Sequence, residues 1–304
     1  MLPKATGRYP VIDPARLGRM LVLEDIDTDA IIQTRMARLK EIWASHDPPA
    51  AAQYDLEELE FDPILINQEC CTYFELLLRD RVNQAARAVT LANAVSTDLD
   101  AIASRYPGGV PRVDGESDTR YRQRVWLSPN PLSPHGTAEG YQFWALSALP
   151  NVRDVTTIKI RPRLDDNPII LVTCMMEGAD PIPTLEQLLV IRRYIIAESR
   201  LAMTDVISIA APKLIKIDYR IKVWLYPTVD EASTLAQLKT NLAALIEDQR
   251  WLGRDHTRAA IAAATMVAGV QNVEIISPAQ DVAVPDDWLG RVGSVTVEYA
   301  GRRQ

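Results

Sequence analysis

The densest group of side chains that could do chemistry lies at residues 116–124, in the sequence E-S-D-T-R-Y-R-Q-R. On a helix that begins near Asp118, Asp118 and Arg122 stand one turn apart and can form an ion pair, while Glu116 lies at the positive helix N-terminus. The plain interpretation is a set of surface salt bridges. An RNA-binding patch is the weaker alternative, because acidic residues interrupt the arginines and few aromatic side chains could stack on bases.

Metal chemistry requires ligands whose spacing brings them to one point. The three histidines lie in three different segments, at positions 46, 135 and 256, and neither H-E-x-x-H nor C-x-x-C occurs. Acidic residues at 25, 27 and 29 imitate the start of a calcium loop, but positions six and twelve of that loop would be Ala30 and Met36. We therefore expect no metal site.

Nucleophiles and phosphate-binding loops are equally hard to find. The sequence has no G-x-x-x-x-G-K-[ST], no G-x-G-x-x-G and no G-x-S-x-G. Cys70 and Cys71 follow Glu69 without a nearby cationic group to activate a thiol, so we expect them to serve in packing. With Cys174 the cysteine count is odd, which predicts no disulfide framework and a reducing cytosol. We expect no cofactor and no catalytic residue.

Composition limits the partners. The 304 residues are 47% hydrophobic and 24% charged, with a net charge of −7, and these values are typical of a globular protein of about two domains. A net acidic chain is a poor ligand for nucleic acid, so protein partners are favoured. The first 20 residues lack an apolar signal region, and no apolar run approaches the ~18–20 residues of a membrane span. We expect neither secretion by a signal peptide nor membrane insertion.

The elements that position these residues begin with a long helix, predicted over 63–95 because no glycine or proline interrupts it after Pro63. Apolar residues recur along it at heptad spacing, with Glu75 as the departure, and Ile66, Phe74 and Leu77 form a neighbouring stripe. The pattern fits an internal helical hairpin or a contact shared with another chain. The candidate interface residues are Cys71, Phe74, Leu78, Val82, Ala85, Val89 and Ala92.

The rest of the first half is also predicted to be helical. We expect Thr28 or Asp29 to cap the first helix and Ser96 or Thr97 to cap the third. Prolines at 129–134 predict a rigid extended link, and residues 49–63 predict a loop or a short helical turn. The predicted helices are 28–45, 97–105, 118–127 and 135–148.

The pattern changes to strands after Pro150. In the segment 214–226, polar residues alternate with apolar ones, which predicts one wet and one buried face. The first unit is predicted to hold strands 152–160, 168–176 and 205–210 and a helix at 184–199. The second is predicted to hold strands 214–226, 271–277 and 293–299 and helices 232–250 and 257–267. We therefore predict a multidomain α+β protein with a helical region at 1–149 and small α+β domains at 150–211 and 212–304.

Several blocks together resemble the baseplate J-like proteins of contractile-tailed phages and R-type pyocins. The motif E-S-D-x-x-Y-R-x-R contains Glu116, Asp118, Tyr121, Arg122 and Arg124, and it precedes the aromatic helix at 136–148. Residues 81–106 and 252–287 also match. The leader 1–20 does not align with the family pattern.

The resemblance implies a structural, non-enzymatic wedge subunit in the tail baseplate of a virion or tail-like particle, assembled in the bacterial cytoplasm. Its implied partners are a second copy, a partner wedge protein in a helical bundle, neighbouring wedges in a six-fold ring, and hub or sheath proteins. Two copies in unequal positions would need hinges, for which Gly108-Gly109 and 129–134 are candidates. The alternatives are a metabolite-binding module or enzyme with its site between α+β domains, and a nucleic-acid-binding tail protein.

Overall fold

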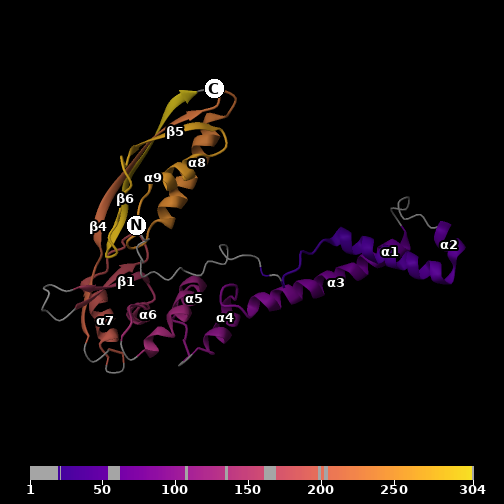
Figure 1. The fold of residues 1–304 in the computed structure, drawn as a ribbon, viewed down its shortest axis with the longest axis horizontal. Helices are drawn as coiled ribbons and strands as arrows, with labels where there is room; N and C mark the ends of the chain where they lie inside the picture. Colours follow the sequence, from indigo (N-terminus) through magenta and orange to yellow (C-terminus); the bar gives the residue numbers. More distant parts are fainter. Residues whose placement is uncertain are drawn as a thin grey trace. The chain divides into compact units, whose positions relative to one another are not determined.

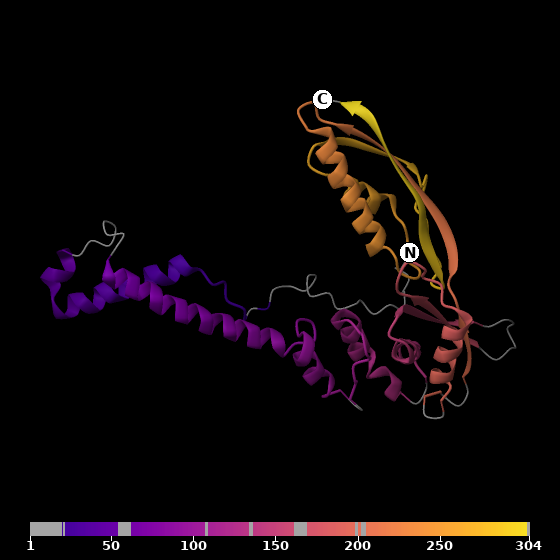
Figure 2. The ribbon, with the colours of Figure 1, turned by 180° about the vertical axis from the view of Figure 1, so that it is seen from behind.

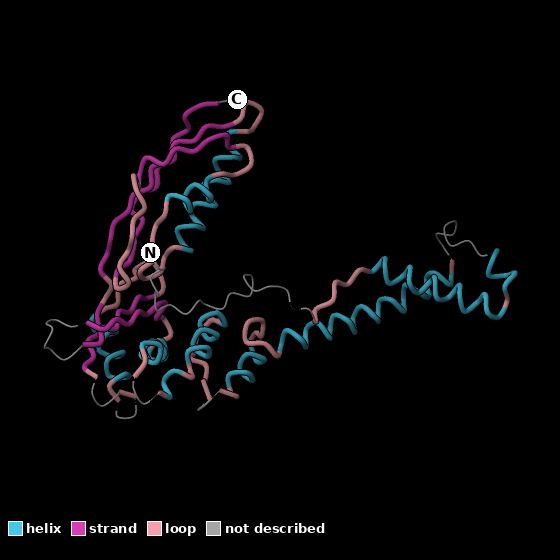
Figure 3. Tube along the Cα trace, in the orientation of Figure 1, coloured by secondary structure: helices cyan, strands magenta, loops and turns pink. Residues whose placement is uncertain are grey.

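The computed structural model describes residues 20, 22–53, 62–106, 109–133, 136–160, 169–197, 200–201 and 205–302. They belong to two compact units, which divide between Arg105 and Tyr106. Figure 3 shows helices and loops but no strands in the described part of the first unit, whereas the second unit contains both strands and helices. Within the described ranges, no helix is both long and apolar enough to cross a membrane.

The first unit contains a helical hairpin. Its elements are α1 (Thr28–His46), α2 (Pro48–Gln53), α3 (Pro63–Ala88) and α4 (Ser96–Ala103). Asp27 caps α1 by accepting from the Ala30 N–H, so the expected cap at Thr28 or Asp29 was placed one or two residues too late. Asp62 caps α3 in the same way, and Pro63 occupies its first turn as predicted.

Helix α3 ends seven residues before the predicted limit. Its C-cap is Val89, and Thr90 Oγ1 donates to the Arg87 carbonyl while the Asn93 side chain donates to Thr90 Oγ1. These side-chain bonds compete with continuation of the helix. The helix therefore ends at a place where the sequence has neither glycine nor proline. Helix α4 then begins at Ser96 with Val95 as its uncapped start, so neither Ser96 nor Thr97 serves as the cap.

The second unit opens with α5 (Asp118–Leu127), the 3₁₀ turn η2 (Asn130–Leu132) and α6 (Ala138–Ala148). The α5 bounds match the prediction, and Ser117 is the N-cap. The expected extended link at 129–134 is wrong for residues 129–132. The proline φ angle suits a helical turn as well as an extended chain, and η2 packs against α6.

A mixed sheet with strand order β1-β2-β3 follows. Its elements are β1 (Val152–Ile160), β2 (Ile169–Met176), α7 (Leu185–Ile195) and β3 (Val206–Ala210), with β1 antiparallel and β3 parallel to β2. A capping box between Thr184 and Gln187 starts α7. Helix α6 packs against both β1 and α7.

A second mixed sheet has the strand order β5-β4-β6. Its elements are β4 (Lys213–Leu225), α8 (Glu231–Asp248), α9 (Arg258–Thr265), β5 (Val270–Ser277) and β6 (Trp288–Arg302). Alternate β4 residues Ile217, Tyr219, Ile221 and Val223 are buried, as the sequence predicted. They form a core with Leu238 and Leu242 of α8 and Ile261 of α9. Figures 1 and 2 show both helices on one side of this sheet.

The two sheets are joined by a small buried junction. The Asp154 carboxylate, on β1, accepts from the Leu252 N–H at 2.9 Å. Leu252 also shares an apolar cluster with Met175 and Leu289. Because the buried carboxylate and the buried N–H satisfy each other, the junction ties the start of the first sheet to the second.

Candidate assembly surfaces and the buried arginine motif

One face of α3 is apolar and exposed. Phe74, Leu78 and Val82 retain 64%, 68% and 59% of their accessible surface, and Cys71 and Ala85 on the same face are exposed too. We call these five residues the α3 stripe. The other two predicted members lie outside the helix, since Val89 is the exposed C-cap and Ala92 is half-buried in the following turn. The structure thus brings five of the seven interface candidates onto one helical face.

The face of α3 that packs toward α1 lies beside the α3 stripe and is largely polar. Glu75 accepts from Arg35 of α1 at 2.9 Å and from Arg79 one turn along α3. Hydrogen bonds lower the pKa of Glu75, with the bond from Arg79 having the larger effect and the bond from Arg35 the smaller one. Asn83 accepts from the Glu24 N–H and donates to the Glu24 carbonyl, both at 3.1 Å. Glu75 therefore departs from the heptad because it belongs to the internal hairpin.

Of the two packing arrangements predicted for the long helix, the structure contains the internal hairpin, and the contact with another chain stays a prediction. The internal hairpin uses the polar face, which includes buried Thr72 and Asn83, and leaves the apolar α3 stripe outside it. A surface helix of a globular protein normally buries its apolar face and exposes its polar one. The reversed arrangement marks the α3 stripe as a surface to be covered by something else.

A second exposed apolar surface lies on α7. Leu185 retains 73% of its surface and Leu189 42%, and Ile196 directly after the helix is also exposed. Spacings of four and seven residues place these three side chains on one helical face. Ile182, in the turn before α7, is exposed as well. Sequence analysis did not single out this surface, although the alternation of leucines with Glu186 and Arg193 contained the signal.

The charged cluster at 116–124 is in the interior, so the expectation of surface salt bridges was wrong. The Glu116 side chain is fully buried, and it pairs with Arg120 and Arg124, whose side chains are 7% and 3% exposed. Arg124 binds both carboxylate oxygens, at 2.8 and 2.7 Å. Burial lowers the pKa of Arg120, and the Glu116 charge opposes that change. A single carboxylate thus compensates two buried guanidinium groups.

The remaining donors of the two arginines bind backbone carbonyls of other elements. Arg120 donates to the carbonyl of Val152 at 2.9 Å and to that of Leu149 at 2.6 Å, and it also bonds the Leu146 carbonyl. Arg124 donates to the Pro111 carbonyl at 2.7 Å. The motif therefore fastens α5 to the end of α6, to the start of β1 and to the preceding loop, which gives it a structural role.

Tyr121, Asp118 and Arg122 complete the motif. The Tyr121 hydroxyl donates to the Val110 carbonyl at 2.6 Å, and the Arg112 guanidinium lies 4.4 Å from the centre of its ring. Asp118 pairs with Arg112 at 2.7 Å. Burial lowers the pKa of the Arg122 side chain, while the Asp118 charge raises it. Asp118 thus acts on Arg122 through its charge, and its ion-pair partner at 2.7 Å is Arg112, which sequence analysis missed.

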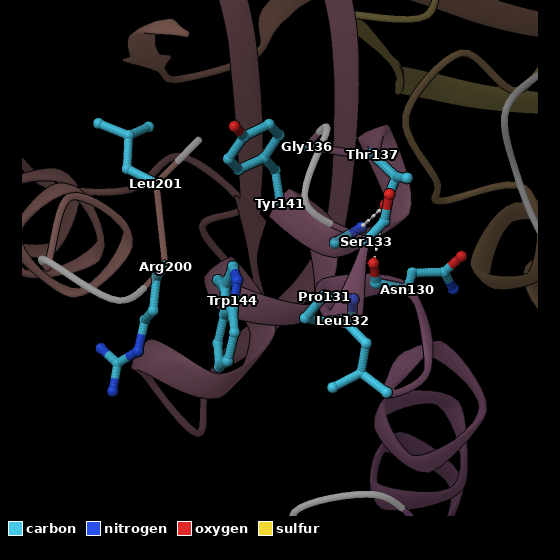
Figure 4. A pocket seen from close by; sticks show the side chains of 11 residues that line it. Asn130, Pro131, Leu132, Ser133, Gly136, Thr137, Tyr141, Trp144, Arg200 and Leu201 are labelled. Carbon is cyan, nitrogen blue, oxygen red and sulfur yellow. Dashed lines mark hydrogen bonds between the residues drawn. The ribbon is translucent and has the colours of Figure 1, made fainter. Parts of the chain in front are cut away.

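A pocket of about 170 Å³ lies between η2, the start of α6 and residues 200–201. Figure 4 shows Trp144 and Arg200 at one end and Asn130 and Thr137 at the other. Small-molecule sites usually enclose about 300–1,000 Å³. The Arg200 guanidinium is already stacked over Tyr194, 3.7 Å from the ring centre. The pocket is therefore smaller than a usual small-molecule site.

The thiols and carboxylates form no candidate metal-binding group among the described residues. No group of three His, Cys, Asp or Glu side chains within them could hold a metal ion. Burial raises the pKa of Cys174 to about 12, which keeps this thiol protonated. Cys70 and Cys71 are exposed, so Cys71 is part of the α3 stripe and neither thiol packs into the core of the chain. His135 lies outside the described residues.

Comparison with known proteins identifies the family. The Baseplate J-like N-terminal domain matches residues 60–112, and the Baseplate J-like protein C-terminal domain matches residues 217–298. Baseplate protein J of Escherichia phage P2 is 29% identical over 288 residues, which are 90% of this chain and 93% of that protein. A chain in the six-fold symmetrised cryo-EM structure of the anti-feeding prophage baseplate is 14% identical with a TM-score of 0.41. That match covers 61% of this chain and 43% of the other. The protein belongs to the baseplate J-like protein family, whose members are structural proteins rather than enzymes.

Proposed function

We propose that this chain is a wedge subunit of the baseplate of a contractile phage tail or tail-like bacteriocin. At the coarser level, its family makes it a structural baseplate component of a phage or tail-like particle. In the finer proposal, the α3 stripe packs against a second copy and a partner wedge protein in a helical bundle. The α+β domains link wedges into a six-fold ring around the hub and contact the sheath.

The observation that carries this proposal is the reversed polarity of α3. Its hairpin face holds Glu75, Arg79 and Asn83, whereas its outer face holds the α3 stripe. Apolar surface removed from water contributes about 25 cal/mol per Å². Covering Phe74 and Leu78 would therefore stabilise an assembly in which other helices supply the missing side of the bundle.

The small apolar core of the first unit supports the same view. Only a few apolar side chains are buried among its described residues, and they are Met36, Ala51, Ala94, Leu99, Ile102 and Ala103. A helical unit gains most of its stability from packing an amphipathic face. Since the largest apolar face is exposed, contacts with other chains would supply much of the stability of this unit.

An exposed apolar surface in the second unit is a candidate contact for a ring. A closed ring needs a heterologous contact between unlike surfaces of neighbouring subunits, and the Leu185–Leu189 face of α7 is one candidate. We keep 1–149, 150–211 and 212–304 as the proposed functional domains. The Glu116 motif would hold α5 and α6 rigid on the first sheet. Residues 129–132 pack against α6, which argues against a hinge there. Gly109, with a φ angle of 63°, is a hinge candidate, and Gly108 lies outside the described residues.

The test compares two lysine substitutions on α3 in the full chain. Leu78→Lys puts a charge in the α3 stripe, whereas Glu69→Lys puts the same side chain nine residues away, half a turn around the helix. Both positions are exposed, so both variants should fold. We expect Leu78→Lys to lose incorporation into purified particles and Glu69→Lys to keep it. Equal incorporation, or a wild-type copy number that is not a multiple of six, would contradict the proposal.

A further inference from the structure

The second α+β domain sends a short segment back to the first one. This segment, residues 247–253, spans the last turn of α8 and the loop that follows, and we call it the strap. Arg153 of β1 donates to the Glu247 carboxylate at 2.5 Å, and its guanidinium lies 5.0 Å from the ring centre of Trp251. Glu247 is exposed, and exposed ion pairs add little stability. These outer contacts therefore orient the strap more than they strengthen it.

The inner part of the strap is buried between the strands of both sheets. The Asp154 carboxylate is 6% exposed and accepts from the N–H groups of Val155 and Leu252, each at 2.9 Å. Leu252, which is fully buried, clusters with Met175 of β2 and Leu289 of β6. Moving the two domains apart would expose these apolar side chains and break the Asp154–Leu252 hydrogen bond at the same time. The inner contacts therefore oppose separation of the domains.

The strap is itself fixed to the second sheet. The Tyr219 hydroxyl of β4 donates to Gln249 Oε1 at 2.9 Å, and the Gly253 N–H donates to the Trp288 carbonyl at 2.8 Å. Gly253 has a φ angle of 62°, and a Cβ there would lie 2.8 Å from the Asp286 Cα. Both this conformation and this close approach require glycine. The strap therefore moves with the second sheet rather than as an independent loop.

The two domains meet along all three strands of the first sheet. Since β1 runs antiparallel and β3 parallel to β2, the start of β1 and the ends of β2 and β3 lie at the same end of this sheet. The strap contacts β1, at one edge, through Asp154, and β2, in the middle, through Met175. Arg250 of the strap also donates to the Gly178 carbonyl just after β2. The chain itself continues from β3, at the other edge, into β4 through residues 211–212.

Attachment at both edges of the sheet opposes hinge motion between the domains. Two domains joined by a single linker normally move relative to each other, and hinges are a few residues that absorb large changes in φ and ψ. The outer strands of a three-stranded sheet are about 10 Å apart, so a bend at residues 211–212 would displace the strap at the opposite edge. Such a bend would pull Leu252 away from Asp154 and Met175.

We propose that the strap locks the two α+β domains into one rigid arm. The lock is a property of the chain, and its consequence in the baseplate rests on the proposed function. There, a displacement imposed on the α7 face of the first domain is passed to the second sheet without being absorbed between the domains. Bending of the subunit takes place outside the arm.

Double electron–electron resonance on the isolated full chain tests the lock. Spin labels are attached to Glu186→Cys in α7 and Lys239→Cys in α8, which are exposed positions of the two domains. The exposed Cys70 and Cys71 are changed to serine, and labelled chain is diluted with unlabelled chain so that only distances within one molecule are measured. We expect one narrow distance distribution. A broad or multiple distribution would overturn the proposal.

Matched double substitutions show whether the strap is the cause of the rigidity. Arg153→Ala with Asp154→Ala removes the β1 side of the contact, whereas Arg258→Ala with Asp281→Ala removes bonds within the second domain alone. We expect the first pair to broaden the distribution at least about twofold, because a single linker permits domain motion. The second pair should leave the width unchanged. A first variant as narrow as the wild type would overturn the role of the strap.

Urea unfolding of the wild type gives a second readout that requires no substitution. Labelling of the buried Cys174 thiol reports on the first domain, and hydrogen exchange of the β4 amides reports on the second. Both signals should change at the same urea concentration, because rigidly coupled domains unfold together. Separate midpoints would overturn the proposal.

Particles separate this inference from the proposed function. The two domains should superimpose as one body in structures of the baseplate before and after contraction. If the chain is present in particles and its two domains shift relative to each other, the rigid arm fails while the proposed function stands. If the chain is absent from particles, the proposed function fails, and the measurements on the isolated chain still decide the lock.

Discussion

The carboxylate of Glu116 and the guanidinium of Arg124 form a bidentate ion pair in the protein interior. Arg124 Nε and Nη2 donate to the two carboxylate oxygens at 2.8 and 2.7 Å, and the two side chains are 3% exposed or less. Paired bonds in this geometry fix direction as well as distance. The pair therefore sets the position of α5 relative to the loop that carries Glu116.

Removing the Glu116 charge should lower the free energy of unfolding substantially. Glu116→Gln preserves the shape of the side chain but leaves Arg120 and Arg124 buried without a counter-charge. Losing one member of a buried pair typically costs about 3–5 kcal/mol, and we expect a loss of this size in the free energy of unfolding measured with urea. The control is Asp118→Asn, whose partner Arg112 is partly exposed, with an expected loss under about 1 kcal/mol. Equal losses of unfolding free energy in the two variants would argue against the view that the buried Glu116 ion pairs hold α5 in place.

Two glycines of β6 should respond differently to the same substitution. A Cβ on Gly290 would overlap the buried ring of His256, whereas a Cβ on Gly293 would meet the flexible end of Lys216 and the exposed Asp218 carboxylate. Overpacking a core typically costs about 1–3 kcal/mol. We expect Gly290→Ala to lower the urea midpoint clearly and Gly293→Ala to change it little. A larger effect at Gly293 would contradict the close packing of β6 on His256.

The stability of the second sheet should depend on pH through His256. Burial lowers the pKa of His256, which is 1% exposed and has Nδ1 2.6 Å from the Tyr219 hydroxyl. The unfolded chain takes up this proton near pH 6.5, but the folded chain resists it. The contribution is thus complete above about pH 6.5 and is lost as the pH falls toward the lower folded pKa.

Urea midpoints at pH 7.5 and 5.5 check this dependence. The wild type should lose stability over this interval, and His256→Gln should lose less, although the variant starts from a lower value. Most carboxylates stay ionised at pH 5.5, so they add little to the difference. An identical pH dependence in both proteins would rule out His256 as its source.

Much of the fold follows from local sequence pattern. The alternation in β4 and the bounds of α5 were predicted correctly because each depends on neighbouring residues alone. The end of α3 was missed because Thr90 and Asn93 stop the helix by side-chain bonding, which is a weaker signal than glycine or proline. Strand order depends on contacts between distant residues, which local patterns do not specify.

The candidate surfaces were only partly predictable. Heptad spacing located the α3 stripe, but it could not tell which face of the helix meets α1. That is decided by Arg35 and Glu24, which lie 40 and 59 residues from their partners Glu75 and Asn83. The high density of charged residues at 116–124 led to the prediction that this segment lies on the protein surface. Its burial depends on carbonyl groups of Leu149 and Val152, which only the tertiary fold brings to Arg120.

The central claim is that other chains cover the α3 stripe in the assembled baseplate, and the native thiols test it most directly. Cys70 and Cys71 are exposed on α3 in this chain, whereas Cys174 is buried and serves as an internal reference. Purified particles and the isolated chain would be treated with a maleimide reagent and the modified cysteines mapped by mass spectrometry. We predict that Cys71 reacts quickly in the isolated chain and is protected in the particle, with Cys174 unreactive in both. Equal labelling of Cys71 in the two states would contradict the account.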